Sequence, residues 1–274
     1  MTIPKDDLPL VPDEAGAHGE NSHLRQQVEA NAGTADAWTL FANHRRHVTD
    51  LIASRAVSNG RLCVLGAGNC NDLDLEHLGP HFAAIHLLDL DGDALARSLQ
   101  RNRAVRDRLV AFGDIDIART AAAQPPELPC GTGFDVVLSA TVFTQIVDGI
   151  VRRLGPGHRA TLDAVLAARR QHLRLMLELL AQGGSAVFVT DFVASETFPA
   201  LAHLPDEALA DTMRALTVSR NFFAGTNPAA IVEDIRRQPE LRSRVRSISQ
   251  RGPWRWRLSR ERQRLVYALV LERA

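Results

Sequence analysis

Cysteine, tyrosine and long apolar runs are all scarce in this sequence. Its 274 residues include three cysteines, Cys63, Cys70 and Cys130, and no two of them form a C-x-x-C pair. An odd, widely spaced set is a poor disulfide framework. The ten histidines do not pair with cysteines or carboxylates at the spacing of metal ligands. We therefore expect no metal site and a reducing environment, which predicts a cytoplasmic protein.

Charge of one sign is missing as well. Lys and Arg together number 32, as do Asp and Glu, so the formal net charge is zero. No overall positive field draws this chain to nucleic acid or to an anionic membrane, although arginines cluster at 101–108, 236–246 and 251–264. No apolar run approaches the ~20 residues that span a bilayer. The acidic N-terminus also lacks the apolar core of a signal peptide. These absences favour a small-molecule partner over nucleic acid or membrane, and they leave a homodimer open.

What the sequence does contain is a regular alternation of short apolar runs and amphipathic segments. The pattern predicts strands at 62–65, 84–88, 109–112, 134–139 and 185–190. It predicts helices at 72–78, 92–105, 158–180, 206–217 and 227–237. Buried strands that alternate with helices indicate an α/β fold, with a doubly wound, mostly parallel sheet and helices on both faces. Two final β-rich runs, 245–250 and 265–271, have no helix between them, so we expect a hairpin that gives a seven-stranded sheet an antiparallel final strand.

Three parts are expected along the chain. Residues 1–21 are predicted to be a flexible leader. Residues 22–58 form a helical cap, in which apolar positions recur at spacings of three and four and Gly33-Thr34 separates two helices. The α/β domain occupies 59–274.

A glycine turn ends the first predicted strand, in the stretch RLCVLGAGNCNDLDL (61–75). The first strand–helix turn of a parallel sheet faces the crevice in which such folds bind ligands. Gly66 and Gly68 let the backbone approach a ligand without a Cβ clash. The dinucleotide pattern G-x-G-x-x-G fails at its third glycine, where Cys70 and Asn71 stand, so a plain turn remains an alternative.

Carboxylates end the next two strands. Asp89 follows the second strand at about twenty residues from the glycines, where dinucleotide folds place the acceptor for ribose hydroxyls. Capping of the next helix is the alternative, but Asp91 and Asp93 can serve that role equally well. The third strand ends in Gly113-Asp114, and the carboxylate of Asp114 can accept from an exocyclic adenine amine. The three strand ends together predict a nucleoside site.

In this order and spacing the motifs resemble those of the class I S-adenosylmethionine-dependent methyltransferases. The matching stretches are VLGAGNCND (64–72), LLDLDGDAL (87–95), AFGDID (111–116), FDVVLSATVFTQI (134–146) and LLAQGGSAVFVTDF (179–192). The resemblance implies a Rossmann-like fold, S-adenosylmethionine as cofactor, and in-line methyl transfer to a small-molecule N or O acceptor. The cofactor-binding residues that it implies are Leu65, Gly66, Ala67, Gly68, Asn69, Asp72, Asp89, Leu90, Gly113, Asp114, Ile115, Ser139, Ala140 and Thr141. Val64 stands where the family often has an acidic residue.

Substrate contacts are expected from segments beyond the strand ends. In the resembling family N-terminal helices often roof the cofactor cleft, so the candidate substrate contacts include Trp38, Phe41 and His47, with core packing of an amphipathic helix as the alternative. Gln145, after the fourth strand, is a further candidate.

Three residues are candidate catalytic groups: His44, His158 and Asp191. For His158 the alternative is a solvated first-turn histidine, and for Asp191 a turn cap. Trp254 and Trp256 lie on one face of a predicted strand, which favours sheet packing over base stacking.

Two other functions share some of these features. An NAD(P)-dependent oxidoreductase has the same glycine turn and ribose carboxylate, but here the third glycine is missing. The only tyrosine, Tyr267, also lies in the last predicted strand, where it cannot form a Tyr/Lys proton relay. A non-catalytic nucleoside-binding or interaction module is the other alternative.

Overall fold

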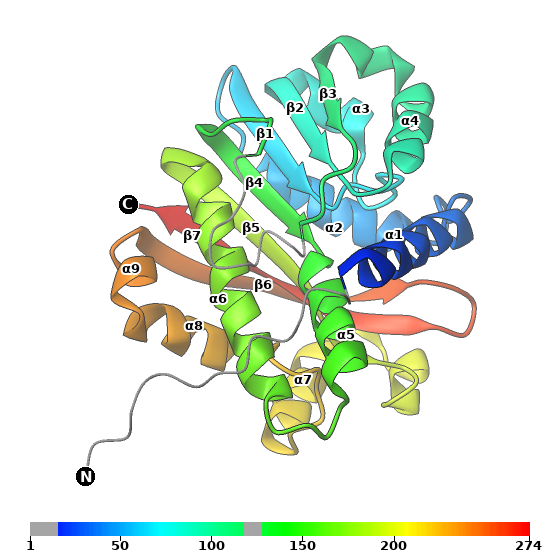
Figure 1. Cartoon of the computed structure of the whole chain (residues 1–274), viewed down its shortest axis with the longest axis vertical. Coiled ribbons are helices and arrows are strands. Elements are labelled where there is room, and N and C mark those ends of the chain that lie inside the picture. Colours follow the sequence, from blue (N-terminus) through cyan, green and yellow to red (C-terminus); the bar gives the residue numbers. More distant parts are fainter. Residues whose placement is uncertain (1–15, 118–127) are drawn as a thin grey trace.

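The computed structural model describes residues 16–117 and 128–274 of the chain, with side chains from Leu24 onward in the first range. Within these residues the strands form one seven-stranded sheet in the order β3-β2-β1-β4-β5-β7-β6 (Figure 1). The strands are β1 (Gly60–Leu65), β2 (Phe82–Leu88), β3 (Leu109–Phe112), β4 (Phe134–Ala140), β5 (Leu180–Ala194), β6 (Val245–Arg257) and β7 (Gln263–Arg273).

Strands β1 to β5 pair in parallel, whereas β7 runs antiparallel to both β5 and β6. The central parallel strands β1 and β4 are almost wholly buried, as expected where helices cover both faces of a sheet. This arrangement confirms the predicted Rossmann-like fold, its seven strands and its antiparallel final strand.

Helices cover both faces of the sheet and pack two separate cores. The helices are α1 (Gly16–Gly33), α2 (Ala42–Ala53), α3 (Leu75–Leu78), α4 (Gly92–Arg101), α5 (Val142–Leu154), α6 (Thr161–Leu179), α7 (Leu209–Val218), α8 (Pro228–Arg237) and α9 (Pro239–Arg242). Short 3-10 turns lie at η2 (Gly79–His81), η3 (Arg103–Arg108), η5 (Pro199–His203) and η6 (Asp206–Ala208). Helices α5 and α6 lie in front of the sheet in Figure 1, and α2 lies behind it.

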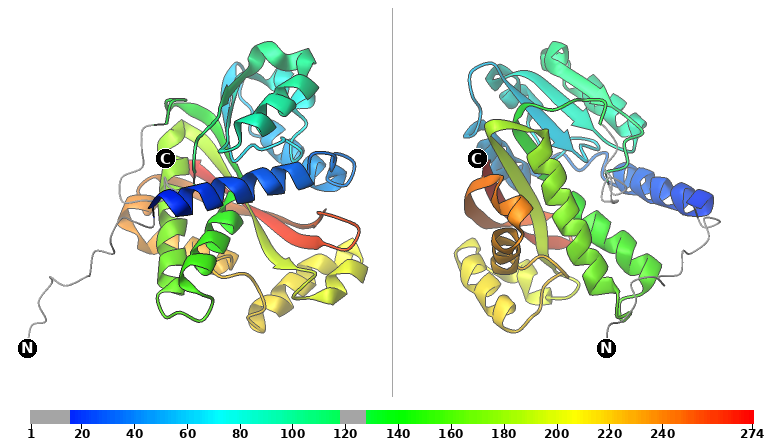
Figure 2. Two further views of the ribbon diagram at one scale, coloured as in Figure 1. Left: turned by 45° about the vertical axis from the view of Figure 1, so that its right-hand side comes forward. Right: turned by 60° about the vertical axis from the view of Figure 1, so that its left-hand side comes forward.

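Helix α1 takes a different position from the others. It crosses the end of the sheet where the parallel strands finish, close to the first turn of α5 (Figure 2, left). It begins at Gly16, inside the predicted leader; residues 1–15 lie outside the described residues. The fold therefore places an N-terminal helix over the edge at which a parallel sheet binds its ligands.

Two helices, α5 and the short α9, lie outside the predicted helical ranges. Helix α5 begins directly after Thr141, whose left-handed φ of 58° turns the chain from β4 into the helix. Its buried residues are Val142, Phe143, Ile146, Val147 and Ile150. This spacing of one, three and four is helical, but β-branched residues in a short apolar run also suit a strand, so periodicity gave no clear answer.

No helix of the described residues is long and apolar enough to span a bilayer.

Candidate functional site

The glycine turn is held in a strained path by its neighbours. Gly66 and Gly68 have φ values of +69° and +47°, in the left-handed region that favours glycine. A Cβ on Gly66 would lie 2.3 Å from the Cγ2 of Val142, on α5. The backbone N–H of Ala67 donates to the carbonyl of Leu88 over 3.0 Å, which ties the turn to β2. Both glycines are thus required by conformation, and Gly66 by close packing as well.

Asp89 links the turn to the end of β2. Its Oδ2 accepts from the N–H of Gly68 over 2.7 Å, and its Oδ1 accepts from the N–H of Asp91 over 2.8 Å. The residue is 2% exposed, and burial raises the pKa of its carboxyl while these hydrogen bonds oppose the rise. Each carboxylate oxygen can accept a second hydrogen bond, so capacity for a ligand hydroxyl remains. Helix α4 is capped by Asp91, whose Oδ1 accepts from Ala94, so the alternative role considered for Asp89 is filled by its neighbour.

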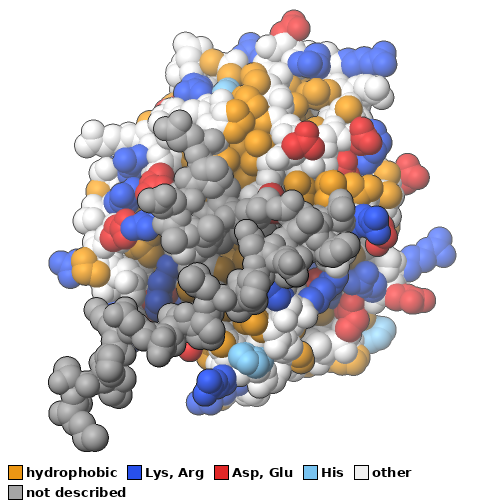
Figure 3. Space-filling view, viewed as in Figure 1, with side chains coloured by type: hydrophobic (Ala, Val, Ile, Leu, Met, Phe, Trp, Pro, Cys, Tyr) orange, Lys and Arg blue, Asp and Glu red, His pale blue; other side chains and the backbone are white. Residues whose placement is uncertain are grey.

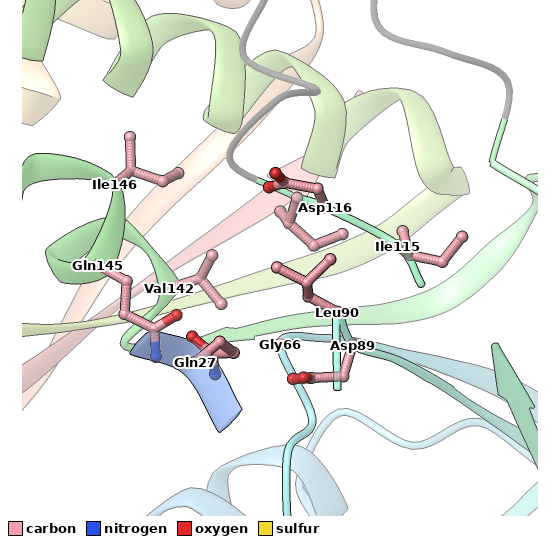
Figure 4. A pocket seen from close by; sticks show the side chains of 10 residues that line it. Gln27, Gly66, Asp89, Leu90, Ile115, Asp116, Val142, Gln145 and Ile146 are labelled. Atoms are coloured by element: carbon pink, nitrogen blue, oxygen red, sulfur yellow. The ribbon is translucent and has the colours of Figure 1, made fainter. Parts of the chain in front are cut away.

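A small pocket with a cavity volume of about 20 Å³ lies at the carboxyl end of the parallel strands (Figure 4). Segments from β1, β2, β3, α5 and α1 surround it. The lining residues are Gln27, Gly66, Asp89, Leu90, Ile115, Asp116, Ile117, Val142, Gln145 and Ile146. Four of them, Gly66, Asp89, Leu90 and Ile115, were predicted as cofactor contacts. Aliphatic walls with carboxylates at the rim suit a flat polar base attached to a sugar.

The carboxylate after β3 corrects one prediction. Asp114 has a left-handed φ of 59° and is exposed, and it does not line the pocket. Asp116, two residues later, lines it instead. Gly113 does not line it either, because it packs against Gly92, where an added Cβ would lie 3.1 Å from the Cα. The motif AFGDID contains both Asp114 and Asp116, and the left-handed turn at Asp114 determines which of the two carboxylates lines the pocket.

Helix α1 supplies two residues that sequence reasoning missed. Gln27 lines the pocket, and in Figure 4 its amide lies close to that of Gln145 on α5. Asn31 donates to the Oδ2 of Asp91 over 3.0 Å, and its Oδ1 lies where a Cβ on Gly68 would reach, at 2.8 Å. Polar residues at these positions of an isolated helix look like a solvated face, so the sequence gave no signal for them.

The side chains after the glycines hold α1 in place. Asn69 donates from Nδ2 to the carbonyl of Asn31 over 2.6 Å, and Asn71 donates to the carbonyl of Thr34 over 2.6 Å. Arg97 in turn donates to the Oδ1 of Asn69. These amides therefore join the turn to the α1–α2 connection, and the structure gives no support to Asn69 as a side-chain contact of the cofactor.

Asp72 lies in a second polar region, beside the pocket. Its Oδ1 is 3.5 Å from the Nε2 of His44, on α2. Burial, together with the nearby charge of Asp191 at the end of β5, raises the pKa of Asp72 to about 7. Burial likewise raises the pKa of Asp191 to about 6, against the opposing effect of Arg264. A half-buried carboxylate, Asp72, and a buried one, Asp191, from distant parts of the chain thus share one region.

His44 is fully buried, and its hydrogen bonds fix its tautomer. Its Nδ1 lies 3.0 Å from the indole Nε1 of Trp254, which can only donate. Nδ1 is therefore the acceptor, and the proton of the neutral ring is on Nε2, facing Asp72. Burial and the nearby His47 lower the pKa of His44 to about 3. With its single free lone pair engaged, the ring is placed to donate to Asp72 rather than to act as a base.

The remaining candidates are dispersed. His158 is exposed in the loop after α5 and accepts from the N–H of Ala160, so the structure does not bring it to the pocket. Ser139 is buried with its Oγ 2.7 Å from the Nε2 of His172, facing the helix layer of α6. Ala140 and Thr141 are buried at the turn into α5, and the hydroxyl of Thr141 donates to its neighbour's carbonyl. Leu65 and Ala67 are buried in the two cores, below the turn.

The predicted aromatic contacts serve packing. Phe41 packs edge-on against Trp256, with ring centroids 5.0 Å apart, and His47 stacks on Trp254 at 5.2 Å. Trp38 lies under the guanidinium of Arg45, whose carbon is 3.4 Å from the ring centroid. The expectation that the two β6 tryptophans pack on the sheet is confirmed, since both are buried against α2.

The sheet order and the pocket define a Rossmann-like α/β protein with a pocket at the carboxyl edge of its parallel strands. No family model matches the chain, and no curated protein matches it. Among solved structures it is similar to an rRNA methylase from Streptococcus thermophilus, at 11% identity over 82% of this chain and 92% of that one, with a TM-score of 0.44.

Two further solved structures are similar to the chain. One is a putative methyltransferase from Streptococcus mutans in complex with SAH, at 10% identity over 82% of this chain and 94% of that one, with a TM-score of 0.39. The other is an arsenic (III) S-adenosylmethionine methyltransferase from Chlamydomonas reinhardtii, at 13% identity over 80% and 64%, with a TM-score of 0.40. At such identities the similarity does not carry an activity over to this chain.

Proposed function

We propose that the chain is an S-adenosylmethionine-dependent methyltransferase with a small-molecule N or O acceptor. The observation that carries this proposal is the convergence of Gly66, Asp89 and the segment 115–117 on one pocket. These are the ends of β1, β2 and β3, where the resembling family places the glycine turn, the ribose acceptor and the adenine contacts.

The pocket fits the adenosyl group by its chemistry. Asp89 is a buried carboxylate with spare acceptor capacity for the ribose hydroxyls. Leu90, Ile117 and Ile146 provide aliphatic surfaces for the base, and Asp116 offers an acceptor for its amine. Asp72, on the loop after the glycines, brings negative charge to the side where a sulfonium would lie. When bound, the cofactor supplies an activated methyl group.

The protein's part in such a transfer is alignment and exclusion of water. Gln27 of α1 and Gln145 of α5 line the same side of the pocket, with their amides close together (Figure 4). Since α1 covers this edge, we expect it to shift when the cofactor enters and to return over the bound molecule. The covered edge favours a small acceptor over a macromolecule. On the face seen in Figure 3, positive and negative side chains are also interspersed rather than gathered into a basic patch.

An NAD(P)-dependent oxidoreductase would need a tyrosine in a proton relay, and Tyr267 does not fill that role. Tyr267 is fully buried within β7, and its hydroxyl donates to the carbonyl of Thr226 over 2.6 Å. Burial raises the pKa of this phenol far above its ordinary value. A tyrosine that is shielded from the pocket and already hydrogen-bonded does not deliver a proton to a substrate there.

Calorimetry tests the proposal. We expect S-adenosylhomocysteine to bind with one-to-one stoichiometry and NAD to give no heat of binding. Asp89→Asn should weaken S-adenosylhomocysteine binding by about 1–3 kcal/mol, because one ribose hydroxyl loses its acceptor. Asp93→Asn is the matched control: it changes an exposed carboxylate in the first turn of α4 and should leave the affinity unchanged. Binding of NAD alone, or equal affinities in all three proteins, would contradict the proposal.

A further inference from the structure

Five elements bring polar side chains together beside the cofactor pocket. Asp72 comes from the loop after β1 and Asp191 from the end of β5; we call these two residues the acidic pair. His44 on α2 faces Asp72 at 3.5 Å, and Arg264 on β7 faces Asp191 at 3.6 Å between Nε and Oδ2. Trp256 on β6 lies directly across from Arg264 in the sheet and stacks on His44, with ring centroids 4.4 Å apart.

Several of these groups are buried without a hydrogen-bond partner among the described residues. The atoms are His44 Nε2, Asp72 Oδ1, Asp191 Oδ1 and Trp256 Nε1. His44, Asp191 and Trp256 are 0%, 5% and 7% exposed, whereas the side chain of Asp72 keeps 20% of its surface open. Leaving a buried polar atom unpaired destabilises the folded protein. Two of these atoms, Asp72 Oδ1 and Asp191 Oδ1, are carboxylate acceptors, and unpaired buried acceptors point to a donor ligand that pairs with them when it binds.

The charge of the region is negative. The Nε of Arg264 faces Asp191, but its Nη1 donates to Glu196 over 2.8 Å, so this one cation is shared between two carboxylates. Arg45 donates to the carbonyls of Trp38 and Asn71 and makes no direct contact with Asp72. His44 is neutral, with its pKa lowered to about 3. The acidic pair is therefore only partly compensated, and a cationic group would complete it.

The region adjoins the cofactor pocket. The Thr144 hydroxyl on α5 lies close enough to Asp191 to lower the pKa of its carboxyl, although the two side chains form no hydrogen bond, and this places the carboxylate near the first turn of α5. Val142 and Gln145 of the same turn line the cofactor pocket. A molecule bound at the acidic pair thus lies next to whatever occupies the pocket.

We propose that the acidic pair binds the methyl acceptor and that this acceptor is an amine, held by Asp191 and deprotonated by Asp72. The inference rests on the proposed function. Asp191 is the better holder of a cation because Arg264 keeps it ionised, whereas Asp72 faces a neutral imidazole and takes up a proton more readily. His44 is a positioning residue that orients Asp72.

The proposed reaction consists of a proton transfer and a methyl transfer. The ammonium proton moves to a carboxylate oxygen of Asp72, and the freed nitrogen lone pair forms the new N–C bond to the methyl carbon. The C–S bond breaks, and its electron pair stays on sulfur, which becomes a neutral thioether. The products are an N-methylammonium ion, which now carries the positive charge of the former sulfonium, and S-adenosylhomocysteine; the proton on Asp72 leaves to solvent.

The test uses the full chain, S-adenosylmethionine labelled in its methyl group, and matched pairs of acceptors. Each primary amine, for example an arylethylamine, a linear diamine or an amino acid amide, is paired with the alcohol of the same skeleton. We expect label in amines and none in alcohols, thiols or carboxylates. The rate for wild type should rise with pH through about 7, where Asp72 loses its proton; its charged neighbours there are Asp191, Arg45 and Arg264.

Two variants separate the roles. Asp72→Asn should lower kcat by about 10²–10⁴-fold, the usual contribution of a general base, and remove the rise near neutral pH. Asp191→Asn should instead raise KM for the amine by about tenfold or more, with a smaller change in kcat. Asp148→Asn, which changes an exposed carboxylate in the middle of α5, should match wild type in both.

Binding of S-adenosylhomocysteine, measured on the same samples, keeps the two proposals distinguishable. If it binds all variants alike but label enters alcohols, thiols or carboxylates, or enters no amine, the amine assignment is overturned and the cofactor assignment stands. Full amine turnover in both Asp72→Asn and Asp191→Asn overturns it as well. If S-adenosylhomocysteine does not bind to wild type, the proposed function itself fails.

Discussion

Asp191 shows at the scale of one residue how a candidate functional group opposes stability. Its carboxyl is 5% exposed, and burial raises the pKa from 3.8 to about 6. Between these values the folded protein holds a proton that the unfolded chain has released. The contribution of this group to stability is complete below pH 3.8 and is lost as pH rises through about 6. At neutral pH the fold thus retains a carboxylate that weakens it.

Replacing that carboxylate should therefore stabilise the protein above neutral pH. Asparagine does not ionise, so we expect Asp191→Asn to raise the free energy of unfolding at pH 8 by about 1–3 kcal/mol and to leave it unchanged at pH 4. Thermal denaturation at both pH values measures this. Asp107→Asn, an exposed carboxylate of η3, serves as the control and should show no difference at either pH. Lower stability of Asp191→Asn at pH 8 would contradict the sign of the pKa shift.

At the scale of single residues, the sequence predicted those site residues whose surroundings are set by the motif that contains them. Asp89 follows a buried strand, and its place at the end of β2 required no knowledge of distant contacts. Asp116 was missed because the left-handed turn at Asp114 decides which carboxylate faces the pocket. His44 was predicted as a base, but its role depends on Trp254, 210 residues further along the chain.

At the scale of elements, the junction between β1, β4 and α5 shapes the pocket. Gly66 follows β1 with a φ of +69°, and Val142 begins α5 so close that an added Cβ would meet it at 2.3 Å. The pocket therefore depends on a left-handed backbone and on the absence of a side chain at one position.

Gly66→Ala should destabilise the fold by about 1–3 kcal/mol, through both the left-handed strain and the contact with Val142. It should also weaken S-adenosylhomocysteine binding, since Gly66 and Val142 line the pocket. Gly149→Ala is the matched control on α5. Gly149 is exposed within the helix and has open space around it, so alanine should stabilise by about 0.5–1 kcal/mol. Denaturant titration distinguishes the two signs, and equal effects would refute the assignment of strain to Gly66.

The elements themselves were largely predictable. Strand β3 was predicted with its observed bounds, and β1, β2 and β4 were predicted to within two residues at each end. Strand β5 is longer than its apolar run, and β6 extends through the two tryptophans, because pairing with a neighbouring strand continues beyond the segment that a local pattern marks. Helix α5 was missed because its apolar composition suits both a strand and a helix.

At the scale of the whole molecule, the final hairpin closes the N-terminal helices onto the sheet. Trp254 and Trp256 of β6 pack on Phe41, His44 and His47 of α2. The indole N–H of Trp254 donates to the Nδ1 of His44, and Asn43 donates to the carbonyl of Arg255 over 3.0 Å. The two ends of the described chain therefore support each other and the acidic pair between them.

Removing the hydrogen bond of Trp254 tests this closure. Trp254→Phe leaves the buried Nδ1 of His44 without a donor, and we expect a loss of about 1–3 kcal/mol in the free energy of unfolding. Trp256→Phe is the comparison, because its indole N–H has no partner among the described residues. It should cost less than Trp254→Phe when both are measured by denaturant unfolding. The reverse order would mean that packing, not the hydrogen bond, holds α2 to β6.

The sequence by itself determined the alternation of strands and helices, the glycine turn and the carboxylate at the end of β2, because these depend on neighbours a few residues apart. Tertiary structure alone decided that α1 covers the pocket, that the Nε2 of His44 carries the proton and faces Asp72, and that Asp72 and Asp191 meet. These features depend on contacts between segments far apart in the chain. The pKa of a buried carboxyl is likewise set by the side chains that surround it in space, and a linear pattern does not contain them.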